Sequence, residues 1–536
     1  MASLPEVLVS IGGARDRSVL ALVVAATLAV TAACGGGAGR DGAPAPKGKP
    51  VAGRTLTVAV PSAPNSLNPA TVDNAFVSYT MLAYDPLIYQ ASDGSLKPAL
   101  AASWKYVGTG NKDFTLALRP GVTFSDGGAL TAAGVKASLD YARKAVGAQA
   151  QLLGAVQSVD VTGPLSLSIK LAAPVPLMPQ ILTQFYGVGE IISPKGLADP
   201  AKLTVSTPSA GIGAYVFDPS TSVAGDHYTY VARRGYYDPS RQHYQKIVMR
   251  VIANPQAALN ALKTKQVDVI TGADVATAAQ AKAAGMQVAS VPFVWQGLNL
   301  IDRGGQVSKP LGDVRVRQAI NYAIDRATVS RAVLGQYGVP TVQTVVPGAD
   351  GYSPAAAKRY PYDLAKAKQL LAAAGYRNGF TLAVLVLQFP GMDTMGQAIA
   401  GQLAKVGITL KLTTVTDAQS YVTDSTNHRY PTVLVGYGAG PMYLMGQGLF
   451  LPAAAVFNGF KTSSAPLIAL YGQAAAAEPA ARAGLDQQMQ EYLVENAWFA
   501  PVAFTPVLYF GRADLGGLTV SPAVPVASPL DWFDTK

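Results

Sequence analysis

A serine and an aspartate lie side by side in the segment FSDG, residues 124–127. A hydroxyl next to a carboxylate can contribute to nucleophilic catalysis, provided that a base lies within hydrogen-bond reach. No histidine or lysine is near Ser125 and Asp126 in the sequence to act as that base. With Gly127 behind it, the pair instead predicts a tight turn that leads into a helix whose N-cap is Thr131.

The other residues that could carry out catalysis or bind a metal are scattered. The three histidines, His227, His243 and His428, are not spaced as metal ligands. No serine is followed three residues later by lysine, and no G-x-S-x-G elbow occurs. The glycine-rich runs GGGAGRDG and GYGAGP lack the lysine of a phosphate loop. We therefore expect no catalytic residues, no metal and no cofactor, although carboxylates that meet only in the fold leave a glycosidase formally open.

The N-terminal 34 residues have the pattern of a targeting segment. Arg15 and Arg17 precede an apolar run at residues 19–30, and small residues follow as far as Cys34, the only cysteine of the chain. The run is too short to span the roughly 30 Å of a bilayer core, so residues 1–33 predict a cleavable signal peptide. Because VTAAC resembles a bacterial lipobox, we expect Cys34 to be lipidated; the alternative is an ordinary secretory signal followed by a stray cysteine.

Residues 34–53 consist almost wholly of glycine, alanine, proline and charged residues. Such a composition predicts a flexible tether with a reach of roughly 25 Å. The formal net charge of +10 is spread along the 536 residues, without a basic run interleaved with aromatics, so we expect no nucleic-acid binding. A chain of this length should fold into two or three domains.

Alternating and helical patterns follow one another along the rest of the chain. Strands are predicted at 55–60, 228–234 and 246–252, and helix-then-strand units at 255–270, 363–387 and 396–415. Strand-and-turn signals occupy 114–124 and 159–171, and Gly163 with Pro164 predicts a hairpin turn in the second. Repeated helix–strand units indicate an α/β fold with largely parallel sheets that helices cover.

Four segments, taken in order, resemble one family. They are LKPALAASW with FTLALRPGVTFSDGGALTAAGVKASL, then LGDVRVRQAINYAIDRATV, YDLAKAKQLLAAAGY and QLAKVGITLKL. Together they are similar to the extracellular solute-binding proteins of ABC importers, of the peptide/nickel type that includes oligopeptide- and dipeptide-binding proteins. The resemblance extends from Thr55 to about Phe510.

The resemblance implies a two-lobed, periplasmic-binding-protein-like fold with a hinge and an additional inserted domain. Lobe I would comprise residues 54–86, 206–290 and 501–536; domain II, the inserted domain, residues 87–205; and lobe II residues 291–500. The chain would cross between the lobes twice, with hinges at 291–297 and 499–505.

Peptide-binding members of the family commonly carry an aspartate within a segment resembling W-x-x-D-Y, where its carboxylate can pair with the α-ammonium of the peptide. The corresponding segment here, residues 435–447, contains no acidic residue. A buried ammonium without a counter-charge is costly, so peptides with a free amino terminus are disfavoured as ligands. Aromatic and amide side chains would hold the solute instead: Trp295, Tyr437, Gln296, Asn299, Tyr443 and Asn65.

The implied function is that of a lipoprotein that captures a peptide or a small uncharged solute outside the membrane. It would deliver the solute to an ABC permease with its ATPase subunits, as a monomer lipid-anchored on the outer face of the bacterial cell membrane. Two other classes stay open: a secreted two-lobed hydrolase, and a lipoprotein receptor for a peptide or protein that has no role in transport. An enzyme would convert the small molecule that a receptor only binds.

Overall fold

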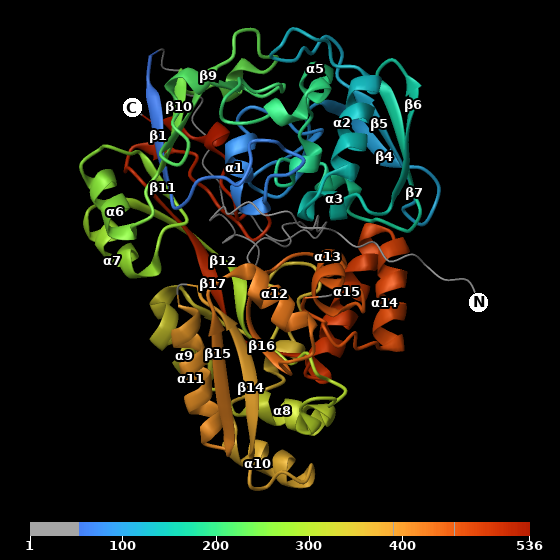
Figure 1. The fold of residues 1–536 in the computed structure, drawn as a ribbon, viewed down its shortest axis with the longest axis vertical. Helices are drawn as coiled ribbons and strands as arrows, with labels where there is room; N and C mark the ends of the chain where they lie inside the picture. Colours follow the sequence, from blue (N-terminus) through green and yellow to red (C-terminus); the bar gives the residue numbers. More distant parts are fainter. Residues whose placement is uncertain (1–52, 390, 455, 536) are drawn as a thin grey trace, which may run out of the picture.

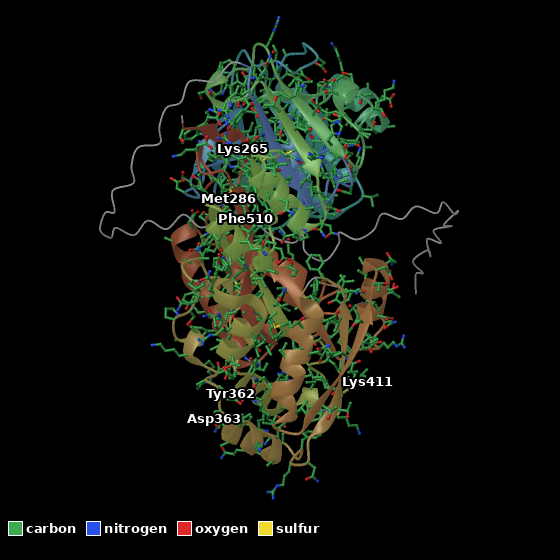
Figure 2. The ribbon with its side chains drawn as sticks, turned by 90° about the vertical axis from the view of Figure 1, so that its left-hand side faces the viewer. Lys265, Met286, Tyr362, Asp363, Lys411 and Phe510 are labelled. Atoms are coloured by element: carbon green, nitrogen blue, oxygen red, sulfur yellow. The ribbon has the colours of Figure 1, made fainter. Side chains whose placement is uncertain are left out.

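Two bodies joined by a pair of long strands make up the molecule (Figure 1). The computed structural model describes residues 53–389, 391–454 and 456–535. The connecting strands are β12 (Gln287–Asn299) and β17 (Phe499–Gly511), which pair antiparallel from Gln287↔Gly511 to Asn299↔Phe499. The two-lobed α/β prediction is confirmed, and Figure 2 shows the same two bodies stacked along the long axis.

Lobe I is built around the buried strand β1 (Thr55–Val60), whose sequence TLTVAV gave the expected strand. Its parallel neighbours are β10 (Lys246–Val251) and β11 (Val269–Thr271). The remaining elements of this body are β8 (Tyr215–Phe217), β9 (His227–Ala232), β18 (Leu515–Gly516), β19 (Phe533–Asp534), α1 (Val77–Thr80), α6 (Pro255–Lys263) and α7 (Val275–Ala283).

Domain II contains a separate antiparallel sheet in the order β4-β5-β7-β6. Its strands are β4 (Ala101–Tyr106), β5 (Asp113–Leu118), β6 (Val156–Gly163) and β7 (Ser166–Leu171), and β2 (Ile88–Gln90) pairs with β3 (Leu96–Pro98). Its helices are α2 (Ala132–Lys144), α3 (Ala148–Leu152), α4 (Met178–Ile181) and α5 (Pro194–Ala198). As predicted, Thr131 caps α2, because its hydroxyl accepts a hydrogen bond from the Gly134 amide.

Among the described residues, lobe II combines four strands with eight α-helices. Its strands are β13 (Val339–Pro340), β14 (Phe380–Leu387), β15 (Ile408–Val415) and β16 (Thr432–Gly438). Its helices are α8 (Val314–Tyr322), α9 (Arg326–Leu334), α10 (Leu364–Ala373), α11 (Met392–Ala404), α12 (Ala418–Thr426), α13 (Met442–Met445), α14 (Ala465–Ala476) and α15 (Pro479–Glu495).

A single large sheet runs through both lobes in the order β15-β14-β16-β12-β17-β11-β1-β10-β9-β8, with β13 added to β17. The prediction of largely parallel sheets is correct for β1 and β14, each of which has two parallel neighbours. It is wrong for the middle of the sheet, where β12 pairs antiparallel with β16 and β17. The reason is that the crossing strands do not belong to helix–strand units.

Domain II and lobe II lie against each other, so the molecule is closed. Buried apolar side chains of both form one shared apolar cluster, which contains Phe114 and Val175 of domain II and Trp295, Tyr437 and Tyr443 of the opposite body. The boundaries predicted for the three parts stay predictions.

The N-terminal predictions fall outside the residues that the structure describes. These are the signal peptide at 1–33, the lipidation of Cys34 and nearly all of the tether at 34–53. Within 53–389, 391–454 and 456–535, no helix combines the length and the apolar character needed to cross a membrane.

Candidate functional site

The two crossing strands, β12 and β17, connect the lobes, and their pairing is irregular at two places. The register shifts between Pro292 and Val294 and again between Gln296 and Gly297. Gly297 faces Pro501, a residue without an N–H to donate to the ladder. The predicted hinges at 291–297 and 499–505 coincide with these irregularities; that they bend stays a prediction.

Three of the six predicted ligand residues lie together in the shared apolar cluster. Trp295 of β12 pairs in register with Tyr437 of β16, although 142 positions separate them in the sequence. Trp295 is fully buried and packs edge-on against Phe499, with ring centroids 5.5 Å apart. Tyr443 of α13 stacks on Tyr471 at 5.3 Å. The three predicted aromatics therefore belong to one buried cluster, to which domain II and lobe II both contribute.

The Trp295 side chain also has an unused polar atom. Its indole Nε1 is buried and has no hydrogen-bond partner among the described residues. Because a buried donor without an acceptor is costly, such an atom marks a place where a ligand or a water molecule can accept a hydrogen bond.

Gln296 points away from Trp295, because successive side chains of a strand face opposite sides of the sheet. Its side-chain Oε1 is buried and has no hydrogen-bond partner among the described residues. In this closed structure it therefore does not share the aromatic surface of Trp295.

Asn299 and Asn65 have side chains that already bind the protein. The Asn299 amide donates to the Phe457 carbonyl (2.8 Å) and accepts from Arg303 (2.7 Å). Asn65 lies in an exposed loop of lobe I, where it donates to the Thr71 carbonyl (3.0 Å) and accepts from the Asp73 amide (3.0 Å). The Asn65 amide thus stabilises its own loop, and the Asn299 amide joins the end of β12 to Phe457 and Arg303. A role of either residue in ligand binding stays a prediction.

A buried ion pair was not anticipated from the sequence. Arg482 and Asp486 of α15 have side chains that are 8% and 3% exposed, and Arg482 Nε lies 3.9 Å from Asp486 Oδ2. Burial raises the pKa of Asp486 to about 7, although Arg482 favours the ionised form. A Cβ placed on Gly351 would meet both Met442 and Asp486, so this acid lies close to the segment 435–447 that itself lacks one.

The FSDG motif is structural. Gly127, with φ of 84°, donates from its amide to the Phe124 carbonyl, which closes the predicted turn. Ser125 Oγ donates to the Ser209 carbonyl at 2.7 Å, and Asp126 accepts from the Gly128 amide at 2.9 Å. The hydroxyl and the carboxylate therefore hold loops together.

The histidines lie apart. His227 contacts Asp226, His243 packs near Phe533, and His428 stacks on Phe460. No cluster of three or more histidine, cysteine, aspartate or glutamate side chains able to hold a metal occurs within the described ranges.

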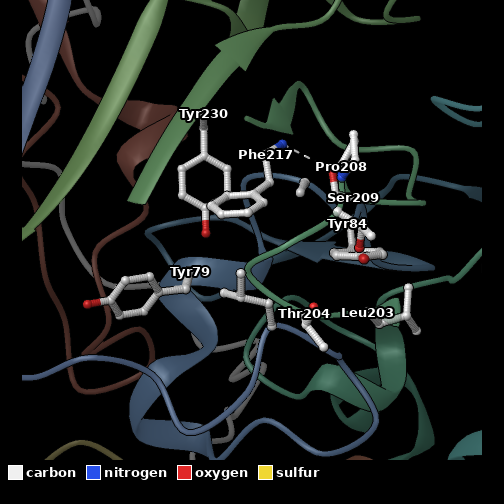
Figure 3. A pocket seen from close by; sticks show the side chains of 11 residues that line it. Tyr79, Tyr84, Leu203, Thr204, Pro208, Ser209, Phe217 and Tyr230 are labelled. Carbon is white, nitrogen blue, oxygen red and sulfur yellow. Dashed lines mark hydrogen bonds between the residues drawn. The ribbon is translucent and has the colours of Figure 1, made fainter. Parts of the chain in front are cut away.

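A hollow within lobe I has aromatic walls (Figure 3). Tyr79, Tyr84, Phe217 and Tyr230 line it, together with residues 203, 204 and 207–209. The buried Tyr230 hydroxyl has no hydrogen-bond partner among the described residues. Since lobe II contributes nothing to this lining, the hollow does not lie between the lobes, and we do not assign the solute to it.

The model of the family described as "Bacterial extracellular solute-binding proteins, family 5 Middle" matches residues 95–448, more than half of the chain. The chain belongs to this family. This family 5 protein is 27% identical over 388 residues to the glutathione-binding protein GsiB of Escherichia coli O1:K1 / APEC; the match covers 69% of the chain and 71% of GsiB.

Solved structures agree with the fold of this family 5 protein. NikA from Brucella suis in complex with Fe(III)-EDTA has a TM-score of 0.75 at 23% identity, covering 90% of this chain and 100% of NikA. DppA from Helicobacter pylori in complex with the peptide STSA has a TM-score of 0.73 at 23% identity, covering 90% and 98%.

The predicted membership of the peptide/nickel-type family is therefore confirmed, and with it the general function. The family 5 protein is a substrate-binding protein of an ABC importer for peptides or small solutes. Proteins of this kind act outside the cytoplasm and work with permease and ATPase components. Its relatives bind solutes and are not enzymes.

Proposed function

We propose that the protein is lipid-anchored through Cys34 and captures a small uncharged solute between the crossing strands and the segment 435–447. The observation that carries this proposal is the surface formed by Trp295, Tyr437 and Tyr443, which belong to a single cluster. Aromatic surfaces with a few polar atoms suit uncharged solutes. The unpartnered indole Nε1 of Trp295 would donate to a carbonyl or hydroxyl oxygen of the solute.

The distribution of charge supports an uncharged solute. Segment 435–447 contains no acidic residue, and the nearby buried acid, Asp486, is paired with Arg482. A cationic solute bound there would have to bring a counter-charge with it, because leaving a buried charge unpaired costs about 3–5 kcal/mol.

Capture would follow from closure of the lobes. A solute that contacts both lobes binds the closed state more tightly than the open one, and this difference in affinity shifts the population towards closure. The closed form would then dock on the permease as a monomer, held near the membrane by its lipid and by the tether at 34–53.

A peptide with a free amino terminus is the second candidate. The specific observation in its favour is Asp486, whose Oδ1 atom is buried without a hydrogen-bond partner among the described residues. If Asp486 exchanged Arg482 for a ligand ammonium, it would replace the acid that segment 435–447 lacks. The glutathione-binding name of GsiB and the peptide in the DppA complex are compatible with such a ligand.

The solute can be identified directly. We would purify a version that lacks residues 1–34, denature it, and analyse by mass spectrometry any small molecule carried through purification. The identified compound should raise the melting temperature of the protein and be recovered unchanged. A peptide with a free amino terminus would favour the second candidate, and conversion of the compound into a product would support the hydrolase alternative.

Trp295→Phe tests the site. This substitution keeps an aromatic ring and removes the Nε1 donor, so we expect the affinity for the identified solute to fall by up to about tenfold, as for the loss of one hydrogen bond. Trp532→Phe is the matched control, because Trp532 is also fully buried with an unpartnered Nε1 but lies in lobe I. Equal affinities of wild type and Trp295→Phe, measured by calorimetry, would remove Trp295 from the site.

The lipid anchor needs its own test. Cys34→Ala should move the protein from the membrane fraction to the soluble extracytoplasmic fraction, since no thiol would remain to accept lipid. Unchanged fractionation would contradict the anchoring proposal and leave solute capture unaffected.

A further inference from the structure

Side chains donate hydrogen bonds across the contact between domain II and lobe II. Asn111 Nδ2 of domain II donates to the carbonyls of Ala475 (2.9 Å) and Ala477 (3.0 Å) at the end of α14. In the opposite direction, Tyr443 and Arg482 of lobe II reach back to domain II. The Tyr443 hydroxyl donates to the Pro174 carbonyl at 3.2 Å, and Arg482 Nη1 donates to the Pro176 carbonyl at 3.3 Å.

Asn111 of domain II caps the C-terminal end of α14, a helix of lobe II. The last carbonyls of a helix have no partner within it, and α14 ends at Ala476. The Asn111 amide satisfies the carbonyls of Ala475 and Ala477, one on each side of that end. When the lobes separate, both carbonyls lose this donor, so closure supplies a cap that α14 lacks in isolation.

The acceptors on domain II belong to a stiff segment. Pro174 and Pro176 flank Val175, and a proline ring restricts φ of its own residue and the conformation of the residue before it. The Val175 amide donates to the Asn111 carbonyl at 3.0 Å. Asn111 therefore binds the segment 174–176 of domain II with its main chain and the end of α14 in lobe II with its side chain. This one residue links the two bodies.

The contact is dry. Asn111, Arg482 and Tyr443 are 5%, 6% and 7% exposed. Val175 and Tyr443 pack in the shared apolar cluster. Breaking the contact would expose these apolar surfaces to water, so the hydrogen bonds and the apolar packing both favour the same closed arrangement.

We propose that Asn111, Tyr443 and Arg482 form an interlobe latch that positions the lobes in the closed state and slows the release of solute. The latch consists of protein–protein contacts alone, so it favours closure even before the solute binds. Only its effect on release rests on the proposed function, because that step requires a solute enclosed between the lobes. Every acceptor of the latch is a main-chain carbonyl, so the three donor side chains determine its strength.

The test measures opening without solute. Spin labels would be placed at Lys105 of β4 and Lys411 of β15, exposed positions on domain II and lobe II, in the full mature chain with Cys34→Ser. Bound solute would be removed by unfolding and refolding, and pulsed electron paramagnetic resonance would give the distance distribution. Lys411 lies far from the upper body in Figure 2, so opening should change this distance measurably.

Asn111→Gly and Tyr443→Phe are the test variants. Asn111 has φ of 53°, a conformation that glycine adopts without strain, so its replacement removes the side chain while retaining the turn. Because two hydrogen bonds are lost, we expect the open-to-closed ratio to rise about tenfold in Asn111→Gly. Tyr443→Phe removes a single hydroxyl, and a severalfold rise is expected.

Two controls match these variants. Lys265→Gly changes a left-handed position of lobe I (φ of 60°), and Tyr360→Phe removes a hydroxyl that donates to the Val494 carbonyl within lobe II. Neither should alter the distance distribution. The latch is overturned if Asn111→Gly and Tyr443→Phe both keep the wild-type distribution, or if the controls open equally. Because no solute is present, a wrong solute assignment would leave this result unchanged.

Discussion

Replacing Asp486 by asparagine should change how the stability of the protein depends on pH. The Asp486 side chain is 3% exposed, its Oδ1 atom has no hydrogen-bond partner among the described residues, and the Arg482 guanidinium lies 3.9 Å from its other oxygen. Burial raises the pKa of this carboxyl from 3.8 to about 7, with Asp350 adding to the rise and Arg482 opposing it. The carboxyl therefore keeps its proton in the folded protein over a pH range in which it is ionised in the unfolded chain.

The sign and size of the effect follow from this difference. Between pH 4 and 7 the folded state binds more protons at Asp486 than the unfolded state, so the free energy of unfolding falls as the pH rises and levels off above the folded pKa. From pH 5 to pH 8 only the interval up to pH 7 contributes. Two pH units at 1.36 kcal/mol each correspond to about 3 kcal/mol.

Asparagine has nearly the same shape and does not ionise, so Asp486→Asn should lack this contribution. Urea denaturation at pH 5 and pH 8 would give the free energies of unfolding of both proteins. We expect the stability of the variant relative to wild type to increase by about 3 kcal/mol between the two pH values. Asp160→Asn, a substitution at an exposed carboxylate of β6, is the control for the loss of one charge. Parallel pH profiles for Asp486→Asn and wild type would refute the reasoning.

Two further predictions concern the close packing of the crossing strands at Gly297 and the structural role of the FSDG motif. Gly297→Ala would place a Cβ 2.3 Å from the Ala500 carbonyl oxygen, so we expect the free energy of unfolding, measured in urea, to fall by about 1–3 kcal/mol. Gly401→Ala is the control, because open space surrounds the new Cβ and the variant should not be destabilised. Equal stabilities of the two variants would contradict the close approach at Gly297. Ser125→Ala removes the hydrogen bond to the Ser209 carbonyl, so we expect the free energy of unfolding to fall by about 1 kcal/mol and the affinity for the solute to stay unchanged. Weakened solute binding would instead indicate that the FSDG motif belongs to the binding site.

Local patterns predicted much of the fold. Helix–strand units such as 255–270 and 363–387 need only neighbouring residues to be recognised, and the structure has α6 with β11 and α10 with β14 there. The antiparallel centre of the sheet was missed because β12 and β17 are joined by about 200 intervening residues. Nothing in either strand alone specifies that the other is its neighbour.

The candidate site was harder to predict for the same reason. Trp295 was recognisable as an aromatic near a crossing, but its pairing with Tyr437 depends on the register of β12 and β16. Arg482 and Asp486 were missed because an arginine and an aspartate four residues apart on a helix usually form an exposed pair. Their burial arises only when α15 packs within lobe II and meets Pro176 of domain II.

The strand pairing at the lobe boundary also has a consequence for evolution and engineering. Residues 300–498 leave the crossing strands after Asn299 and return at Phe499, and these two residues are direct partners in the ladder. A segment whose ends lie side by side can be exchanged as a cassette, as in domain insertion, without moving the rest of the chain. Most of lobe II, including Tyr437 and Tyr443, could thus be replaced by the equivalent segment of a relative in a single recombination, while Trp295, lobe I and domain II keep their sequence.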